Sequence, residues 1–290
     1  KILGKLKENY ELGIQYYARD HRKMRMLDMT DNGDLWRAIG AKFPAYQILP
    51  DTNYVSYVKD NILASLYTTA KSAEVRPTSE DDKELCTKLN IVLDNFWSVN
   101  NVGFKQFQAG ERAALLNMGI TQVGWNENVL IGTGDYQQKG QVILKNINPM
   151  HFMRDPFSTC LEDAGWCCTF ERYHKSVIMA DKNYREKFKE FLSNNNGAGS
   201  TEAIPNYGQA QEAASHKDHY NVFIFWVRTP DGKVDEYHTL DFNIILYERL
   251  NIKPSFFPFA ELYCNLPSSG LVGVSGPAKI FANNVAYNLM

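Results

Sequence analysis

The chain has 290 residues, of which 44% are hydrophobic and 22% are charged, and its formal net charge is −2. These values are typical of a globular protein with a substantial core and exclude wholesale disorder. A chain so close to neutral also lacks the strong positive charge of proteins that hold DNA tightly over their whole surface. Its apolar runs, such as Val222–Val227, are far shorter than the roughly 20 residues of a membrane-spanning helix, so we expect no membrane partner.

The first half of the chain has mainly helical patterns. Residues 5–28 combine many charged side chains with tyrosines and look helical. Apolar side chains recur every four positions over residues 54–66, which predicts an amphipathic helix. A further helical pattern starts at Ser79, which forms a potential capping box with Asp82, and Gly119 is predicted to stop it.

Strand patterns follow in the second half. Apolar and β-branched residues predict strands at 120–125, 141–147 and 166–173. A single helix is predicted over residues 176–193, which would be about 27 Å long at about 1.5 Å per residue. Residues 194–218 are polar and rich in small side chains, and they are predicted to form a linker.

A β-hairpin is predicted after this linker. Two β-rich runs, 220–228 and 233–240, flank an Asp231-Gly232 pair, which is typical of a tight hairpin turn. Residues 243–247 are predicted to add a third strand, and Pro277 suits the first turn of a last helix. Helices and antiparallel strands together predict an α+β fold.

Cysteine and histidine residues gather in one region of the chain. Cys160, Cys167, Cys168 and His174 lie within fifteen residues. Neighbouring residues on a strand point to opposite faces, so Cys167 and Cys168 would not both bind one zinc ion. We therefore expect no metal and no cofactor. An odd and sparse set of five cysteines also forms no disulfide framework, which favours a reducing compartment.

Three other patterns suggest chemistry only weakly. The segment Gly273–Lys279 lacks the lysine directly after its last glycine that a phosphate-binding loop needs. Asp155 with Glu162 and Asp163 suggests paired carboxylates, but no other functional side chain converges on them. The basic stretch Arg19–Arg25 is more simply a solvated helix face. We therefore expect no catalytic residue and no enzyme.

Four segments follow one another in an informative order. The first is the helix at 51–70 with Glu74-Val75-Arg76-Pro77, and the second is the helical region 79–118 leading into Thr121–Asn126. The third is the string Lys145–Pro156 with Leu161–Trp166. The fourth comprises the charged helix, the β-rich segment and the Phe256–Phe259 loop, followed by a helix that contains Asn283, Asn284 and Asn288. This order resembles that of a tailed-bacteriophage portal protein, the head-to-tail connector ring, of the short-tailed-phage type. The third segment is the most specific, and the resemblance covers about residues 40–290.

The resemblance implies a division into wing, stem and clip. Residues 1–173 would be the first part of the wing, 174–194 the first stem helix, 195–272 the β-rich clip and 276–290 the start of the second stem helix. The crown would be absent from this segment. Because the sequence starts with Lys rather than Met and ends within a helical pattern, we expect that it is cut from a longer polypeptide.

The resemblance also implies a function and partners. Twelve copies would form a homo-oligomeric ring at one capsid vertex, through which double-stranded DNA is packaged and ejected. The ring would contact the major capsid protein, dock the terminase and later hold the tail adaptor. It would be assembled in the host cytoplasm and remain in the virion. A near-neutral surface suits such a conduit, because a strongly basic lumen would hold the duplex fast.

Two sets of residues receive a role from this resemblance. Lys279, Asn283 and Asn284 of the last helix are expected to line the channel, although the family often has Gln where this chain has these asparagines. Ring closure needs contacts between unlike surfaces of neighbouring subunits, and strand edges can supply them. The candidates for this subunit interface lie on the predicted hairpin: Phe223, Phe225 and Trp226.

Two alternatives stay open at this point. The first is a soluble enzyme of unknown reaction, such as a cysteine hydrolase that uses Cys167, Cys168 and His174. The second is another multimeric virion protein, such as a head–tail adaptor. An adaptor would not need two stem helices around a β-rich insertion.

Overall fold

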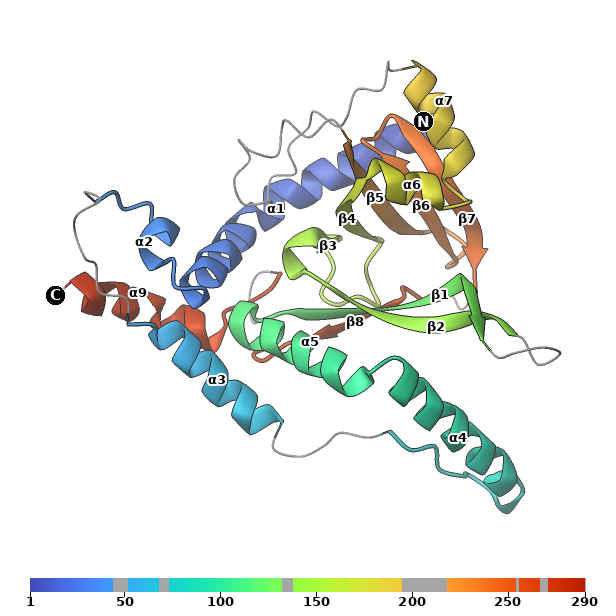
Figure 1. Ribbon diagram of the computed structural model, residues 1–290, viewed down its shortest axis with the longest axis horizontal. Coiled ribbons are helices and arrows are strands. Elements are labelled where there is room, and N and C mark those ends of the chain that lie inside the picture. Colours follow the sequence, from blue (N-terminus) through green and yellow to red (C-terminus); the bar gives the residue numbers. More distant parts are fainter. Residues whose placement is uncertain are drawn as a thin grey trace. The chain divides into compact units, whose positions relative to one another are not determined.

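The computed structural model describes residues 1–43, 52–67, 73–131, 138–194, 218–253, 256–266 and 271–289 (Figure 1). This part of the chain divides into two compact units. Unit 1 consists of Lys1–Met26, Asn148–Phe257 and Ser269–Val272. Unit 2 consists of Leu27–Ile147, Pro258–Ser268 and Gly273–Met290. Both units combine helices with antiparallel strands, which confirms the α+β class. The predicted linker falls almost entirely at 195–217, outside the described residues.

Unit 1 is built on an antiparallel sheet, and its described strands have the order β3-β4-β5-β6-β7. These are β3 (Phe152–Arg154), β4 (Trp166–His174), β5 (His219–Arg228), β6 (Val234–Leu240) and β7 (Ile244–Ile252). The predicted hairpin is confirmed as β5 and β6. At its turn Gly232 has a φ of +74°, a conformation that suits glycine, and the Thr229 amide donates to the Lys233 carbonyl at 2.8 Å.

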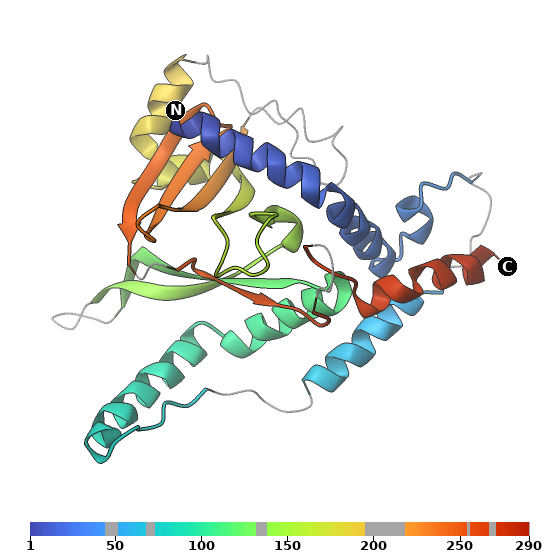
Figure 2. The same cartoon turned by 180° about the vertical axis from the view of Figure 1, so that it is seen from behind.

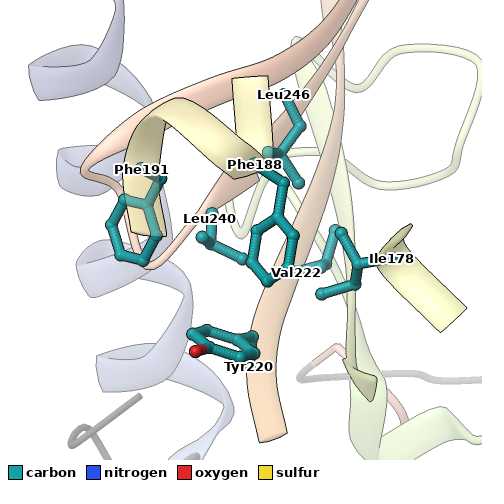
Figure 3. Close-up of a cluster of buried hydrophobic side chains, with 7 residues drawn as sticks. All are labelled: Ile178, Phe188, Phe191, Tyr220, Val222, Leu240 and Leu246. Carbon is teal, nitrogen blue, oxygen red and sulfur yellow. The ribbon is translucent and has the colours of Figure 1, made fainter. Parts of the chain in front are cut away.

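Helices cover both faces of this sheet, which explains why β5 is apolar along most of its length. The N-terminal part of α1 (Ile2–Asp31) places Tyr10 against Phe223, with ring centroids 4.8 Å apart. On the other face, α6 (Lys175–Ala180) and α7 (Arg185–Asn194) pack over the strands. Figure 3 shows this second core, in which α6, α7 and three strands contribute Ile178, Phe188, Phe191, Tyr220, Val222, Leu240 and Leu246.

The prediction of one continuous helix over 176–193 was wrong. The chain leaves the helical conformation at Asp181, whose ψ is 123°. The Asp181 carboxylate accepts a hydrogen bond from the Asn183 amide at 2.8 Å. Asp and Asn compete with helices in this way, because their short side chains bind nearby backbone groups. Two short helices therefore take the place of the single long helix that the sequence predicted.

Unit 2 contains a second antiparallel sheet with the order β2-β1-β8 among its described strands. Its strands are β1 (Gly119–Ile131), β2 (Gln138–Ile147) and β8 (Phe259–Leu262). Helices surround it: the end of α1, α2 (Leu35–Ala38), α3 (Tyr54–Leu66), α4 (Lys83–Val99), α5 (Val102–Leu116) and α9 (Gly276–Leu289). A 3₁₀ turn at Glu80–Asp82 precedes α4, and the predicted capping box of Ser79 and Asp82 is confirmed.

The α5–β1 junction corrects the predicted role of Gly119. The helix ends at Asn117, which has a φ of +64°. The Asn117 side chain donates to the Asn265 carbonyl at 2.8 Å and accepts from the Asn265 amide at 2.9 Å. Gly119 begins β1 instead, and a Cβ there would lie 2.2 Å from the Ala109 carbonyl oxygen. The glycine is therefore needed for close packing of the strand on α5.

The predicted domain boundaries do not follow the sheets. β4 lies before the boundary at residue 173 and pairs with β5 from Trp166↔Val227 to His174↔His219. β8 lies in the predicted clip, yet it pairs with β1 in unit 2. Strand pairing of distant segments gives no signal in local sequence patterns, so boundaries predicted from those patterns need not follow the sheets. The names wing, stem and clip stay a prediction.

Candidate functional site

The junction of α9 with α3 holds the residues that were predicted to line a channel. The two helices pack closely, since a Cβ at Gly276 would lie 2.9 Å from Ile62 Cδ1. Asn284 is buried, and its Oδ1 accepts a hydrogen bond from the Tyr54 amide at 3.0 Å. Asn288 is buried one turn further on and exchanges hydrogen bonds with the Thr52 backbone at 2.8 and 3.1 Å. Two asparagines of α9 therefore cap the start of α3.

This arrangement separates the three predicted channel residues. Asn284 faces α3 inside unit 2 and is only 1% exposed, which does not fit a place on a channel wall. Lys279 and Asn283 lie one turn apart on α9, and both are exposed. The helical pattern could not reveal this difference, because either face of α9 has apolar and polar members.

The start of α3 also binds the end of α1 within unit 2. Asn53 accepts from the Ser56 amide at 3.0 Å and donates to the Thr30 and Asp31 carbonyls at 2.7 and 3.1 Å. Lys59 Nζ lies 2.7 Å from Asp31 Oδ2. Burial acts to lower the pKa of Lys59, but the hydrogen bond and charge of Asp31, together with the charges of Asp60 and Glu111, outweigh it and raise that pKa. Hydrogen bonds and an ion pair thus join α1 and α9 to the first turns of α3.

The predicted interface residues Phe223, Phe225 and Trp226 lie in the core of unit 1. Each is at most 2% exposed. Their strand β5 has β4 on one edge and β6 on the other, so its backbone is already paired. A strand in this position has no free edge for a neighbouring subunit. Helices cover both faces of this sheet, and this burial explains the apolar pattern of β5 that suggested an interface.

The later part of the most specific string of the sequence, from Asp155 onward, forms a compact loop between β3 (Phe152–Arg154) and β4 (Trp166–His174). The Asp163 carboxylate accepts hydrogen bonds from the Cys160 amide at 2.9 Å and from the Thr159 amide and hydroxyl at 3.1 and 2.7 Å. These donors, the Cys160 amide first, hold the pKa of Asp163 well below its usual range. Arg154 is buried and donates to the Thr159 carbonyl at 3.2 Å. The acidic residue is therefore used to fold the loop.

The structure does not bring together the residues of the cysteine-hydrolase alternative. Cys167 and Cys168 are buried on β4, and burial raises the pKa of the Cys168 thiol. His174 is exposed at the far end of that strand, about 20 Å from Cys168 at about 3.3 Å per residue. Its Nδ1 accepts from the Ser176 amide at 3.2 Å and caps α6. Within the described ranges, no group of three His, Cys, Asp or Glu side chains could hold a metal ion.

One half-buried chain of hydrogen-bonded side chains was missed in the sequence. The Tyr184 hydroxyl is hydrogen bonded to His238 Nδ1, and His238 Nε2 lies 3.0 Å from Glu236 Oε1. Burial raises the pKa of Tyr184, which disfavours the phenolate that a nucleophile would need. The chain therefore fastens the turn before α7 to β6. The alternation of Glu236 and His238 on one strand face was the available signal.

Comparison with known proteins decides between the remaining interpretations. A family model described as phage P22-like portal protein matches residues 15–246, which is well over half of the chain. The chain belongs to this family. A search of curated proteins finds no match. Portal proteins of this family are structural components of the phage capsid that assemble as homo-oligomeric rings, so the resemblance seen in the sequence is confirmed.

The portal match reaches from within α1 to within β7 and includes the Asp155–Trp166 string. It stops before α9, so Lys279 and Asn283 lie outside the matched residues. The family is structural rather than enzymatic, and the portal role is favoured over an enzyme or adaptor. None of the described helices of this portal protein is both long and apolar enough to span a membrane.

Proposed function

We propose that this portal protein forms the ring at a single capsid vertex through which double-stranded DNA is packaged and later ejected. Twelve copies would form the ring in the host cytoplasm, where it contacts the major capsid protein and docks the terminase before it binds the tail adaptor. The observation that carries the proposal is the family match over residues 15–246. The net charge of −2 supports it, because a conduit must let the duplex slide.

The proposal keeps part of the predicted organisation. Residues 1–173 would belong mainly to the wing and 276–290 to the second stem helix, with Lys279 and Asn283 toward the channel. Their exposure on α9 supports this assignment, whereas the buried Asn284 would support α3 from behind. The interrupted helices α6 and α7 would lead toward the clip in place of a continuous first stem helix.

Electron microscopy of the purified full-length protein tests the proposal. We expect closed rings with a central hole wide enough for a DNA duplex. Particles that remain monomers or dimers under all assembly conditions would contradict it. The channel assignment is tested separately in a ring structure, where Lys279 and Asn283 should face the hole rather than a neighbouring subunit.

A further inference from the structure

The helix α4 carries an apolar stripe that its own chain leaves uncovered. Apolar residues follow one another at intervals of three and four positions, which places them on one face of the helix. Four of them are between 42% and 64% exposed, and Phe96 is half-buried. The α4 stripe consists of Leu85, Leu89, Val92, Phe96 and Val99.

A different face of α4 is the one packed within the chain. Cys86 is its buried residue, and Asn90 exchanges hydrogen bonds with the Val75 backbone at 2.8 and 3.0 Å. In both views α4 extends beyond the strands of unit 2 (Figures 1 and 2). Most helices in proteins are stabilised by packing of their apolar face. An exposed stripe of this length therefore indicates a surface that is covered in an assembly.

A second apolar surface lies on the sheet of the same unit. Val123 and Trp125 share one face of β1, and Trp125 pairs directly with Val142 of β2. These side chains are 46%, 56% and 37% exposed. We call Val123, Trp125 and Val142 the sheet patch. Neither the α4 stripe nor the sheet patch contains a charged residue, so the two surfaces match in character.

We propose that the α4 stripe of one portal subunit packs against the sheet patch of the next subunit. The inference rests on the proposed ring, because a closed ring joins two unlike surfaces of the same chain at every interface. Unit 2 carries both the α4 stripe and the sheet patch, which provides such a pair within one compact body. The occupant is therefore a second copy of this chain.

The size of the stripe sets the expected effect. It covers 14 helical steps, or about 21 Å, and a helix is about 10 Å wide, so it provides roughly 200 Å². A standard interface buries about 800 Å² on each partner. The stripe is then about a quarter of the contact. Its loss should weaken assembly at least tenfold while leaving the isolated subunit folded.

The first experiment uses sedimentation velocity on the full-length protein with Leu89→Lys and Val92→Lys combined. We expect rings to require at least tenfold more protein than the wild type, with an unchanged melting temperature of the monomer. The matched control is Ile91→Lys, because Ile91 is 65% exposed on another face of the same helix. If the wild type forms rings, two results would overturn this inference alone. One is that the double variant assembles as well as the wild type, and the other is that Ile91→Lys weakens assembly as much as the double variant does. A wild type without rings would overturn the proposed function as well.

A mixing experiment tests the pairing of the two surfaces. Val123→Lys alters the sheet patch and should weaken ring formation in the same way. When it is mixed with the Leu89→Lys and Val92→Lys chain, each mixed pair retains one intact interface. We expect heterodimers in the mixture at concentrations where either variant alone is monomeric. Stripe variants that form normal rings but fail to bind terminase or capsid protein would show a foreign partner and contradict the proposal.

Discussion

Strand β5 in unit 1 and helix α4 with strand β1 in unit 2 treat large apolar side chains in opposite ways. In unit 1, Phe223, Phe225 and Trp226 are at most 2% exposed, because β5 has strands on both edges and helices on both faces. In unit 2, Val92 is 64% and Trp125 is 56% exposed. The residues of β5 complete their packing within one chain, whereas α4 and β1 leave apolar surface for the assembly that we propose. The position of an apolar residue relative to sheet edges and helix faces thus matters more than its hydrophobicity.

The largest difference between the units should appear on truncation of an apolar side chain. We expect Phe225→Ala to lower the free energy of unfolding of the monomer by about 3–5 kcal/mol, because it removes a fully buried ring. The matched change Val92→Ala in unit 2 should stay within about 0.5 kcal/mol. Urea denaturation measures both. Equal losses would break the comparison, since they would place Val92 in a core of the monomer.

Acid should destabilise unit 1 through His21. Burial, then the charges of His151 and Arg25, lower the pKa of His21 from 6.5 to about 4. Below pH 6.5, His21 therefore binds a proton in the unfolded chain but not in the folded chain. The free energy of unfolding falls as the pH drops toward 4. The loss from this residue is about 3 kcal/mol.

The measurement is urea denaturation of the wild type and His21→Gln at pH 7 and pH 4.5. The variant should lose less stability than the wild type over this interval. A wild type and a His21→Gln variant with the same pH dependence would contradict the account.

The helix junction in unit 2 should depend on a buried amide and not on its exposed neighbour. Asn284→Ala removes the acceptor of the Tyr54 amide, and we expect a loss of about 1–3 kcal/mol. Asn283→Ala should change the unfolding free energy by less than about 0.5 kcal/mol. Thermal melting of the monomer compares them. If Asn283 is the more sensitive of the two, the orientation of α9 on α3 is wrong.

The smallest effect is expected at the start of α4. Ser79→Ala removes the Ser79 hydroxyl, which donates to Asp82 Oδ2 at 2.9 Å, and leaves the half of the capping box in which the Ser79 amide donates to that oxygen at 3.2 Å. The expected cost is about 1 kcal/mol. Circular dichroism during urea unfolding measures it. The cost should be greater in the monomer than in assembled rings if neighbouring subunits also stabilise α4, and an identical cost in both would weaken that view.

Local sequence patterns predicted the elements that have clear turn or capping signals. The β5–β6 hairpin follows from Asp231-Gly232 between β-rich runs, and the capping box at Ser79 follows from its spacing to Asp82. Both depend on contacts within a few residues, which a sequence contains. The break at Asp181 was also local, and its signal was the Asp-Lys-Asn run that the helical periodicity around it outweighed.

The candidate site could be predicted only in part, because it depends on contacts between distant segments. Asn284 looks like a surface residue until the Tyr54 amide, 230 positions away, supplies its partner. Phe223 looks like an interface residue until β4 and β6 occupy both edges of its strand. The exposure of α4 could not be predicted either, because an apolar stripe on a helix normally indicates a face buried within the same chain.

Hydrogen exchange on the full-length protein before and after assembly tests the central claim most directly. We expect the amides of α4 to exchange at least tenfold more slowly in the rings than in the monomer, because neighbouring subunits cover the stripe. The amides of β5 should exchange equally slowly in both states. If α4 exchanges at the same rate in assembled and unassembled protein, while β5 gains protection, then unit 2 is not the assembling surface and the contrast between the units is reversed.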